Sequence, residues 1–418
     1  MSRFWHPFAD MKAVRRTGPV VIDRAEGYYV FDADGKRYLD ATASLWYCNV
    51  GHGRTSIVEA ARAQMARLET YSTFGDLANG PILELAERLG DISPIADSVA
   101  FFTSGGSDSI DTSVKLARRY WQVVGQPERR VVISRSRAYH GMHVAGTGIA
   151  GIDANVDGYG RMFPDVARVE WDSYEELEAV IEDLGAERIA AFVCEPIIGA
   201  GGVLAPPPGY LEKARAVCRD AGVLFIADEV VTGFGRTGYW FASERFDLQP
   251  DMIVCAKGIT SGYLPMGALI VSPEVAEPWF AGDAGMWRHG YTYSGHATVA
   301  AAALANLDLL EDEQLVVGAK TLESDLASAL APLAEHDLVS GVRAGTGVLA
   351  AVQLEADAVA DDPALPGRVM AGCRTAGIMS RLLLGDAIHI SPPLTLDGSG
   401  LTELRQGIRA GLDLAAAG

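Results

Sequence analysis

Residues 224–238, LFIADEVVTGFGRTG, decide the fold of this chain together with residues 255–260, CAKGIT. The first stretch is an apolar run that ends in two carboxylates, Asp228 and Glu229, and the second is an apolar run that ends in a lone lysine, Lys257. Such runs are typical of strands that are covered on both faces, as in a parallel sheet. The chain between Asp228 and Lys257 is long enough for one β-loop-α-loop-β excursion, so both side chains can line one crevice.

Similar apolar runs alternate with helical patterns through the middle of the chain. Amphipathic patterns at 56–68 and 81–92 predict helices. Six runs predict strands: SVAFFTS (98–104), RRVVISRS (129–136), RIAAFVCEP (188–196), GVLFIADEV (222–230), DMIVCAKG (251–258) and MGALIVS (266–272). Alternating strands and helices predict an α/β fold with a mostly parallel, doubly wound sheet.

The two chain ends have a different pattern. YYVFDADGKRYLDA (28–41) predicts a hairpin with Asp34 and Gly35 in its turn. Residues 296–333 are helical in pattern and lead out of the central region, and the remainder mixes short strands and helices. We therefore predict a large domain over residues 56–299 and a small α+β domain built from residues 1–55 and 300–418.

Composition excludes several classes of protein. The chain has 418 residues and a formal net charge of −19, which disfavours an extended nucleic-acid footprint and an anionic membrane surface. No apolar stretch predicts a signal peptide or a transmembrane helix. The five cysteines form no C-x-x-C pair, so we expect free thiols, no zinc knuckle or other metal site, and a cytoplasmic location.

A glycine-rich turn follows the first predicted strand. Gly105, Gly106 and Ser107 stand where FFTSGGSDS (101–109) passes from a strand into an amphipathic helix. A helix N-terminus offers free N–H groups and the positive end of the dipole, so an anion fits there. The alternative is an ordinary capped turn, with Ser107 or Asp108 as the N-cap residue.

Further polar and aromatic residues follow neighbouring strands. Tyr139 offers a flat face to an aromatic ligand, unless it packs in the core with its hydroxyl satisfied. Glu195 ends another strand, either as a ligand-facing acid or as the cap of a loop. Ligands of open parallel sheets bind beyond the carboxyl ends of the strands, so these residues are expected to share the crevice of Asp228 and Lys257.

This combination suits one kind of cofactor. A lysine buried in a crevice loses solvation, which lowers its pKa and makes its amine a nucleophile toward an aldehyde. The acid can hold a proton on a pyridine nitrogen, the helix N-terminus can hold a phosphate, and the tyrosine can cover a ring. Those are the parts that pyridoxal 5′-phosphate requires.

The sequence resembles the class III aminotransferases of fold type I, which include the ω-amino-acid and amine transaminases. The resemblance covers nearly the whole chain, and the run from Asp228 to Lys257 is highly specific for the family. It is carried by FWHPF (4–8), DADGKRYLDATASLWYCNVGHGR (32–54), SGGSDSIDTSVKLAR (104–118), CEPIIGAGGV (194–203), ADEVVTGFGRTG (227–238), AKGITSGYLPMGA (256–268), YTYSGH (291–296) and GIMSRLLLGDAIHISPPL (377–394).

The resemblance implies a role for each matching residue. Lys257 matches the lysine that forms the Schiff base, and Asp228 matches the acid that pairs with the pyridinium nitrogen. Thr292 matches a threonine that reaches the phosphate of the other subunit, which implies a homodimer with shared sites and leaves a tetramer open. The other expected cofactor contacts are Gly105, Gly106, Ser107, Tyr139, His140, Glu195 and Val230.

The sequence departs from the family pattern in the glycine-rich turn and in the expected substrate pocket. Asp108 stands where the family often has glutamate, and Arg381 lies one residue further from the following Gly-Asp pair than in some amine transaminases. Arg381 is either the arginine that binds a substrate carboxylate or a partner in a surface salt bridge. Trp46 either lines the pocket or packs beneath its entrance. Phe8, Tyr71 and Phe74 are expected to join the pocket, some from the partner subunit.

The resemblance implies a transaminase that moves an amino group from an ω-amino acid or primary amine to a 2-oxo acid such as pyruvate. The reaction would pass through the Lys257 Schiff base and pyridoxamine phosphate. Three alternatives remain open at this point: a diaminopelargonate- or ornithine-type transaminase, an aminomutase or epimerase with the same cofactor, and a binding protein that keeps the fold without catalysis.

Overall fold

A seven-stranded sheet forms the centre of the protein, whose computed structural model describes residues 3–417. The strand order is β4-β10-β9-β8-β7-β5-β6, and only β10 runs antiparallel to its neighbours. The strands are β4 (Val99–Thr103), β5 (Val131–Arg135), β6 (Val166–Val169), β7 (Ile189–Cys194), β8 (Leu224–Asp228), β9 (Met252–Cys255) and β10 (Gly267–Val271). The predicted mostly parallel sheet and all six predicted strands are confirmed, whereas β6 was not predicted.

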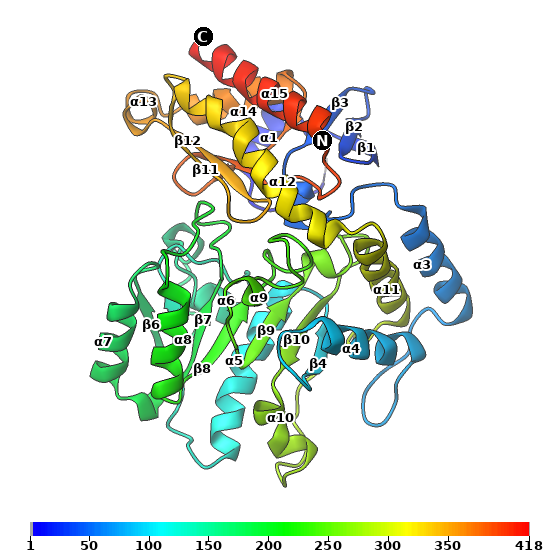
Figure 1. Cartoon of the computed structure of the whole chain (residues 1–418), viewed down its shortest axis with the longest axis vertical. Helices are drawn as coiled ribbons and strands as arrows, with labels where there is room; N and C mark the ends of the chain where they lie inside the picture. The colour runs from blue at the N-terminus through cyan, green and yellow to red at the C-terminus, as the bar shows by residue number, and fades with distance from the viewer. Residues whose placement is uncertain (1–2, 418) are drawn as a thin grey trace.

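Helices cover both faces of this sheet, as the apolar character of its strands requires (Figure 1). On one face, α5 (Gly106–Val123) packs Ile110, Val114 and Trp121 against strand residues such as Ile226. On the other face lie α7 (Tyr174–Leu184) and α8 (Tyr210–Asp220). Three short helices join the loops: α6 (Val144–Gly148), α9 (Ala242–Arg245) and α10 (Pro273–Phe280).

The chain ends meet above the carboxyl edge of the large sheet and form two smaller sheets (Figure 1). The first contains β1 (Ile22–Glu26), β2 (Tyr29–Asp32), β3 (Arg37–Asp40) and β13 (Ile378–Met379), with β13 parallel to β3. The second contains β11 (Val339–Arg343), β12 (Ala350–Leu354), β14 (Leu382–Leu383) and β15 (Ala387–Ile390). The β2–β3 hairpin is confirmed, while the domain boundaries at 55/56 and 299/300 stay a prediction.

The helical stretch at 296–333 is broken into two helices. Gln314 adopts a left-handed φ of 53° between α11 (Ala297–Asp312) and α12 (Leu315–Leu330). Helix α11 packs on two earlier helices, α3 and α4. The remaining helices are α1 (Met11–Thr17), α2 (Ala43–Trp46), α3 (Thr55–Arg67), α4 (Gly80–Ile92), α13 (Ala356–Asp361), α14 (Leu365–Thr375) and α15 (Gly398–Ala416).

A fully buried arginine ties the chain ends to the loop after β8. One terminal nitrogen of Arg236 donates to Asn49 Oδ1 at 2.6 Å, and the other donates to the carbonyls of Pro392 at 2.6 Å and Val348 at 3.3 Å. Asn49 in turn donates to the carbonyl of Phe234 at 2.8 Å. These bonds hold segments from both chain ends over the edge of the sheet where the cofactor residues were expected.

Three features of residues 3–417 bear on the expected class of protein. No helix within residues 3–417 has the length and apolar character needed to cross a membrane. All five cysteines are buried and unpaired, as free thiols. Within that part of the chain, no cluster of three or more histidine, cysteine, aspartate or glutamate side chains has the arrangement of a metal site.

The crossing of α14 and α15 gives a test of the fold. A Cβ added at Gly411 would lie 2.6 Å from the backbone nitrogen and Sγ of Cys373. We expect Gly411→Ala to lower the free energy of unfolding by about 1–3 kcal/mol through overpacking. The control is Gly318→Ala in α12, where the Cβ meets open space and stability should rise by about 0.5–1 kcal/mol. Thermal unfolding measures both, and an unharmed Gly411→Ala variant would contradict this helix crossing.

Candidate active site

A cavity of about 440 Å³ opens where the strands of the large sheet end and the chain-end segments cover them. The strand ends that supply its inner wall are those of β4, β5, β7, β8 and β9, and α2 and the loop near β14 supply the outer wall. The predicted residues that line it are Phe8, Trp46, Gly106, Ser107, Tyr139, His140, Glu195, Asp228, Val230, Lys257 and Arg381.

Four of the residues expected in the site do not line this cavity. Gly105 lies just outside it, before the first residue of α5. Tyr71 and Phe74 are 63% and 57% exposed, and Thr292 is also exposed. Tyr71, Phe74 and Thr292 therefore do not line the cavity of the chain to which they belong.

Lys257 begins a short turn of 3₁₀ helix directly after β9 and has a left-handed φ of 48°. Backbone conformations of this kind are costly for residues with a side chain and cluster at functional sites. Within the described chain its amine makes no hydrogen bond or ion pair. Burial lowers the pKa of Lys257 to about 8, against the opposing effect of Asp228 and Glu195. At pH 7 roughly a tenth of Lys257 is therefore neutral, far more than for an ordinary lysine, and the neutral amine is the form that a nucleophile or base requires.

Asp228 ends β8 and is held in one orientation. Its Oδ2 lies 2.7 Å from Nδ1 of the buried His140, and its Oδ1 accepts from the backbone N–H of Val230 at 3.1 Å. Asp228 is itself buried at 4% exposure. A fixed, buried carboxylate of this kind can pair with a protonated ring nitrogen, because the orienting bonds are in place before a ligand arrives.

Glu195 fulfils both roles that the sequence left open. Its Oε1 accepts from the backbone N–H of Tyr139 at 2.9 Å, and its Oε2 accepts from Gly199 at 3.0 Å, so it braces two loops. It also lines the cavity. Burial raises the pKa of Glu195, whereas the proximity of His140 lowers it.

The second carboxylate after β8 points away from the cavity. Glu229 is fully buried and accepts from the backbone N–H groups of Ala242 at 2.7 Å and Ser243 at 2.6 Å. The hydroxyls of Thr232 and Ser243 also donate to it. Asp228 therefore faces the site, and Glu229 fixes the loop behind it.

The glycine-rich turn forms the expected helix N-terminus. Gly105 is the N-cap residue of α5, so the alternative of Ser107 or Asp108 as N-cap is wrong. Their side chains are used elsewhere: Ser107 Oγ accepts from Met142 N at 3.1 Å, and Asp108 Oδ2 accepts from Ser104 N at 3.1 Å. The first turn keeps N–H groups that have no intrahelical partner, as an anion site requires.

Trp46 and Arg381 form the outer wall together. The Arg381 guanidinium carbon lies 4.5 Å from the centre of the indole, a cation–π contact. Arg381 forms no ion pair with any described residue, so the alternative prediction of a surface salt bridge is wrong. Trp46 lines the cavity. It is also only 4% exposed and packs in a small apolar cluster, so it combines the two arrangements that the sequence left open.

Sequence reasoning missed several apolar members of the wall. Leu45, Val231, Leu382 and Leu384 line the cavity. Leu45, Val231 and Leu382 each lie beside a predicted residue, and Leu384 lies three residues after Arg381; this proximity was the only signal available. Their side chains make the outer part of the cavity apolar, which suits the hydrocarbon part of a substrate.

The fold and the site together define a class of protein, an α/β enzyme with a buried lysine opposite an oriented acid and an anion-binding helix. The chain belongs to the class III aminotransferases, whose family model, described as aminotransferase class-III, matches residues 11–412. It is 40% identical over 442 residues to the putrescine–pyruvate aminotransferase of Pseudomonas aeruginosa, covering 100% of this chain and 96% of the relative.

Solved structures agree with this assignment. An (S)-enantioselective omega-transaminase from Thermomicrobium roseum is 41% identical, with a TM-score of 0.94 over 98% of this chain and 96% of that one. An amine transaminase from an uncultivated Pseudomonas species, solved in its PLP-bound internal aldimine form, is 37% identical, with a TM-score of 0.94 over 100% and 99% of the two chains. The protein is thus a pyridoxal-phosphate-dependent aminotransferase of fold type I.

The residues of the cavity fit this cofactor. The Lys257 amine has no hydrogen-bond or ion-pair partner among the described residues, Asp228 is an oriented carboxylate, and the α5 N-terminus offers an anion site. Gly106 adds a steric argument, because a Cβ there would lie 3.1 Å from both methyl groups of Val230. A side chain at that position would require Val230 to shift by a few tenths of an ångström, so glycine allows the helix its close approach to the cavity.

The burial of Lys257 predicts a pH-dependent stability in the cofactor-free protein. Because burial lowers the pKa of Lys257 to about 8, the folded state is penalised below that pH, and the penalty is relieved as pH rises from 8 toward the unfolded value. We expect Lys257→Met to raise the free energy of unfolding by roughly 1–3 kcal/mol at pH 7 and by much less at pH 10.

Thermal unfolding of the cofactor-free variants at several pH values measures this effect. The control is Lys12→Met, which removes an exposed lysine in α1 and should give no pH-dependent difference. A Lys257→Met stabilisation that is absent, or that is the same at pH 7 and pH 10, would show that Lys257 is not desolvated.

Proposed function

We propose that this aminotransferase moves an amino group from a primary amine or ω-amino acid to a 2-oxo acid such as pyruvate. The observation that carries the proposal is the composition of the outer wall, where Trp46 and leucines surround the Arg381 guanidinium. An apolar wall accommodates the carbon chain of an amine, and an unpaired guanidinium accommodates the carboxylate of an oxo acid. The similarity to a putrescine–pyruvate aminotransferase supports both halves of the reaction.

Lys257 is the group that moves the proton. Its neutral amine would take the proton from the donor carbon that bears the nitrogen, and the resulting ammonium would deliver it to the carbon on the other side of that nitrogen, as general base and then general acid. The pKa of about 8 keeps both protonation states accessible near neutral pH. In the second half-reaction the direction reverses, and Lys257 returns the proton to the carbon of the oxo acid.

Pyridoxal phosphate, when bound, supplies a ring that takes up the electron pair left by the departing proton. Asp228, held by His140, would keep the ring nitrogen protonated. The N–H groups at Gly106 and Ser107 would hold the phosphate, and Tyr139 would cover the ring. Burial raises the pKa of Tyr139, so its phenol stays neutral there.

Arg381 provides the positive charge for the carboxylate. It lies partly buried in the cavity wall and has no acidic partner among the described residues, so its charge is available to a ligand. Burial lowers the pKa of Arg381 from its ordinary value, but an arginine remains protonated at any physiological pH.

We further propose a homodimer with shared sites, located in the cytoplasm. Thr292, Tyr71 and Phe74 are exposed and stand outside their own cavity, which suits residues that serve a partner's site. Five buried free thiols suit a reducing compartment.

The absorbance of the cofactor-loaded enzyme tests the proposed reaction. Adding putrescine, 4-aminobutyrate, ornithine or 1-phenylethylamine should bleach its yellow colour with at least one donor, and pyruvate should restore it. We expect Lys257→Ala to lower turnover by at least about 10³-fold while the fold is kept, and Lys213→Ala, an exposed control in α8, to leave turnover unchanged. Turnover without any 2-oxo acid would instead favour an aminomutase or epimerase.

The shared site has its own test. If Thr292 of each subunit contacts the phosphate in the other, Thr292→Val removes one hydrogen bond to an anion. We expect cofactor affinity to fall about tenfold, because a hydrogen bond to a charged group contributes about 1.5 kcal/mol or more. Equilibrium dialysis measures the affinity and sedimentation measures the dimer. An unchanged affinity in an intact dimer would contradict the shared phosphate contact.

A further inference from the structure

A fully buried histidine lies directly behind Trp46. His389 in β15 packs its ring against the indole with centroids 4.1 Å apart and planes tilted by 36°. The Arg381 guanidinium also contacts the indole, at 4.5 Å from its centre. His389 does not line the cavity itself. Its ring therefore contacts the substrate wall through the indole of Trp46.

His389 is also bonded to the segments that carry both of these residues. Its backbone N–H donates to the carbonyl of Arg381 at 2.9 Å. Its Nε2 lies 2.7 Å from Ser391 Oγ, which donates at 3.3 Å to the carbonyl of Thr42, the residue before α2. With the hydroxyl donating to Thr42, Nε2 would be the nitrogen that carries the imidazole proton. Nδ1 is buried and has no partner among the described residues.

The charges around His389 keep the ring neutral. Burial holds the pKa of His389 well below its ordinary value, and Arg381, Arg236 and Lys257 all act in the same direction. A protonated imidazole at this position would be destabilised by burial and by these three cations. The ring thus acts as an uncharged aromatic support, which lets a guanidinium lie close by.

Trp46 needs such a support because its own backbone is strained. Ala43, Ser44 and Trp46 all have left-handed φ values, of 43°, 59° and 64°. Residues other than glycine keep this conformation only where surrounding contacts impose it. Without the His389 ring, the indole of Trp46 would lose the contact that fixes its plane. The Arg381 guanidinium would then lose a fixed surface on which to pack.

We propose that His389 is a positioning residue for the acceptor: by holding Trp46, it keeps the Arg381 guanidinium in place for the carboxylate of the 2-oxo acid. The inference rests on the proposed function, in which Arg381 binds that carboxylate. His389 would thus help the enzyme to distinguish oxo acids from simple aldehydes, although it lies outside the cavity. An aldehyde has no carboxylate for Arg381 to bind.

Two acceptors separate this role from a general loss of structure. We expect His389→Leu to lower kcat/KM for pyruvate about tenfold, the effect of losing a stacking contact and the geometry that depends on it. For butanal, which has no carboxylate, kcat/KM should change by less than about twofold. A merely structural defect would lower both values together and would lower Tm, which is measured alongside.

Two further substitutions identify which part of the side chain acts. His389→Phe keeps an aromatic ring behind Trp46 and loses the bond to Ser391, whereas His389→Gln keeps a hydrogen-bonding group and loses the ring. We expect the phenylalanine variant to retain most of the pyruvate activity and the glutamine variant to resemble His389→Leu. The opposite order would overturn the proposal, because it would make the Ser391 bond the active feature.

A double-mutant cycle with Arg381→Met completes the test. If His389 acts through Arg381, His389→Leu should have no further effect on pyruvate in the Arg381→Met background, and an undiminished effect there would overturn the proposal. Wild-type enzyme that fails to use pyruvate would refute the proposed function instead. Calorimetric binding of propanoate to the cofactor-loaded variants would then still decide the question, since only a positioning role predicts about tenfold weaker binding in His389→Leu.

Discussion

The site depends on one costly arrangement, a lysine amine taken out of water beside two carboxylates. The parallel pairing of β8 and β9 makes it possible, because their register sets Asp228 beside Val254, three residues before Lys257. A charged amine in this position is penalised by burial and favoured by Asp228 and Glu195, and the outcome is a pKa of about 8. The same burial raises the neutral, nucleophilic fraction of the amine, so the feature that lowers stability also favours the proposed chemistry.

Other side chains in and around the cavity fix the orientation of Asp228 and of the loops that line the site. His140 fixes the direction of Asp228, Glu195 braces the loops at Tyr139 and Gly199, and Glu229 secures the loop after β8 from behind. Each contact is made within the chain alone, before any ligand is present. Preorganised dipoles and charges of this kind cost no reorganisation when the reaction occurs.

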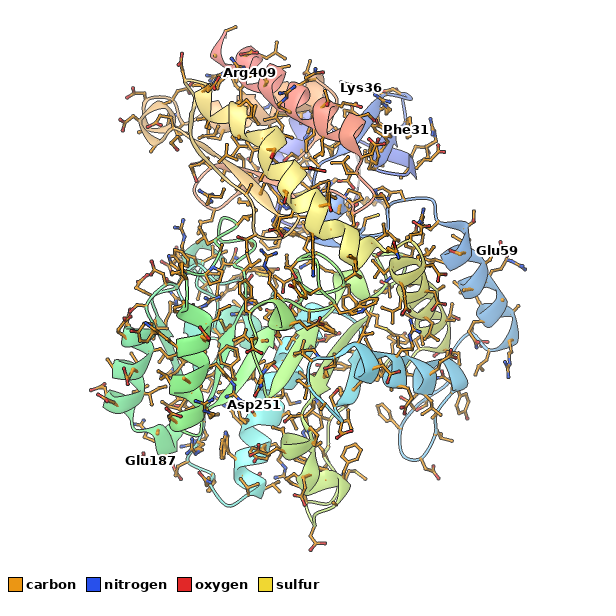
Figure 2. All side chains as sticks on the ribbon, in the orientation of Figure 1. Phe31, Lys36, Glu59, Glu187, Asp251 and Arg409 are labelled. Atoms are coloured by element: carbon orange, nitrogen blue, oxygen red, sulfur yellow. The ribbon has the colours of Figure 1, made fainter. Side chains whose placement is uncertain are left out.

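The chain ends supply the outer part of the cavity. They supply Phe8, Trp46 and Arg381 to the cavity, and the buried Arg236 fixes two chain-end segments over the sheet through Asn49 and Pro392. The large sheet thus provides chemistry that is common to the family, while the covering segments provide an apolar wall with one cation. Figure 2 shows how densely side chains fill the region between these two parts of the molecule.

Much of this architecture was predictable because buried parallel strands produce apolar runs that end in polar residues. The six predicted strands and the meeting of Asp228 with Lys257 follow from that pattern. Strand β6 was missed because it is short and only partly buried, and the break at Gln314 was missed because no glycine or proline marks it. The N-cap of α5 was ambiguous because serine, aspartate and glycine all suit that position.

The outer wall was the least predictable part of the site. Whether Arg381 pairs with an acid or with an indole depends on how segments more than three hundred residues apart meet, and no local pattern records that. His389 carries even less signal, since a histidine within a short strand has no periodic or motif context. These residues acquire their roles from tertiary packing alone.

The position of the cofactor lysine is the central claim, and reductive trapping tests it most directly. The protein is loaded with pyridoxal phosphate, reduced with borohydride, digested and analysed by mass spectrometry. The account predicts one stoichiometric label on Lys257, and no label there when Lys257 is replaced by alanine. A label on a different lysine, or a loaded protein in which Lys257 stays unmodified, would contradict it.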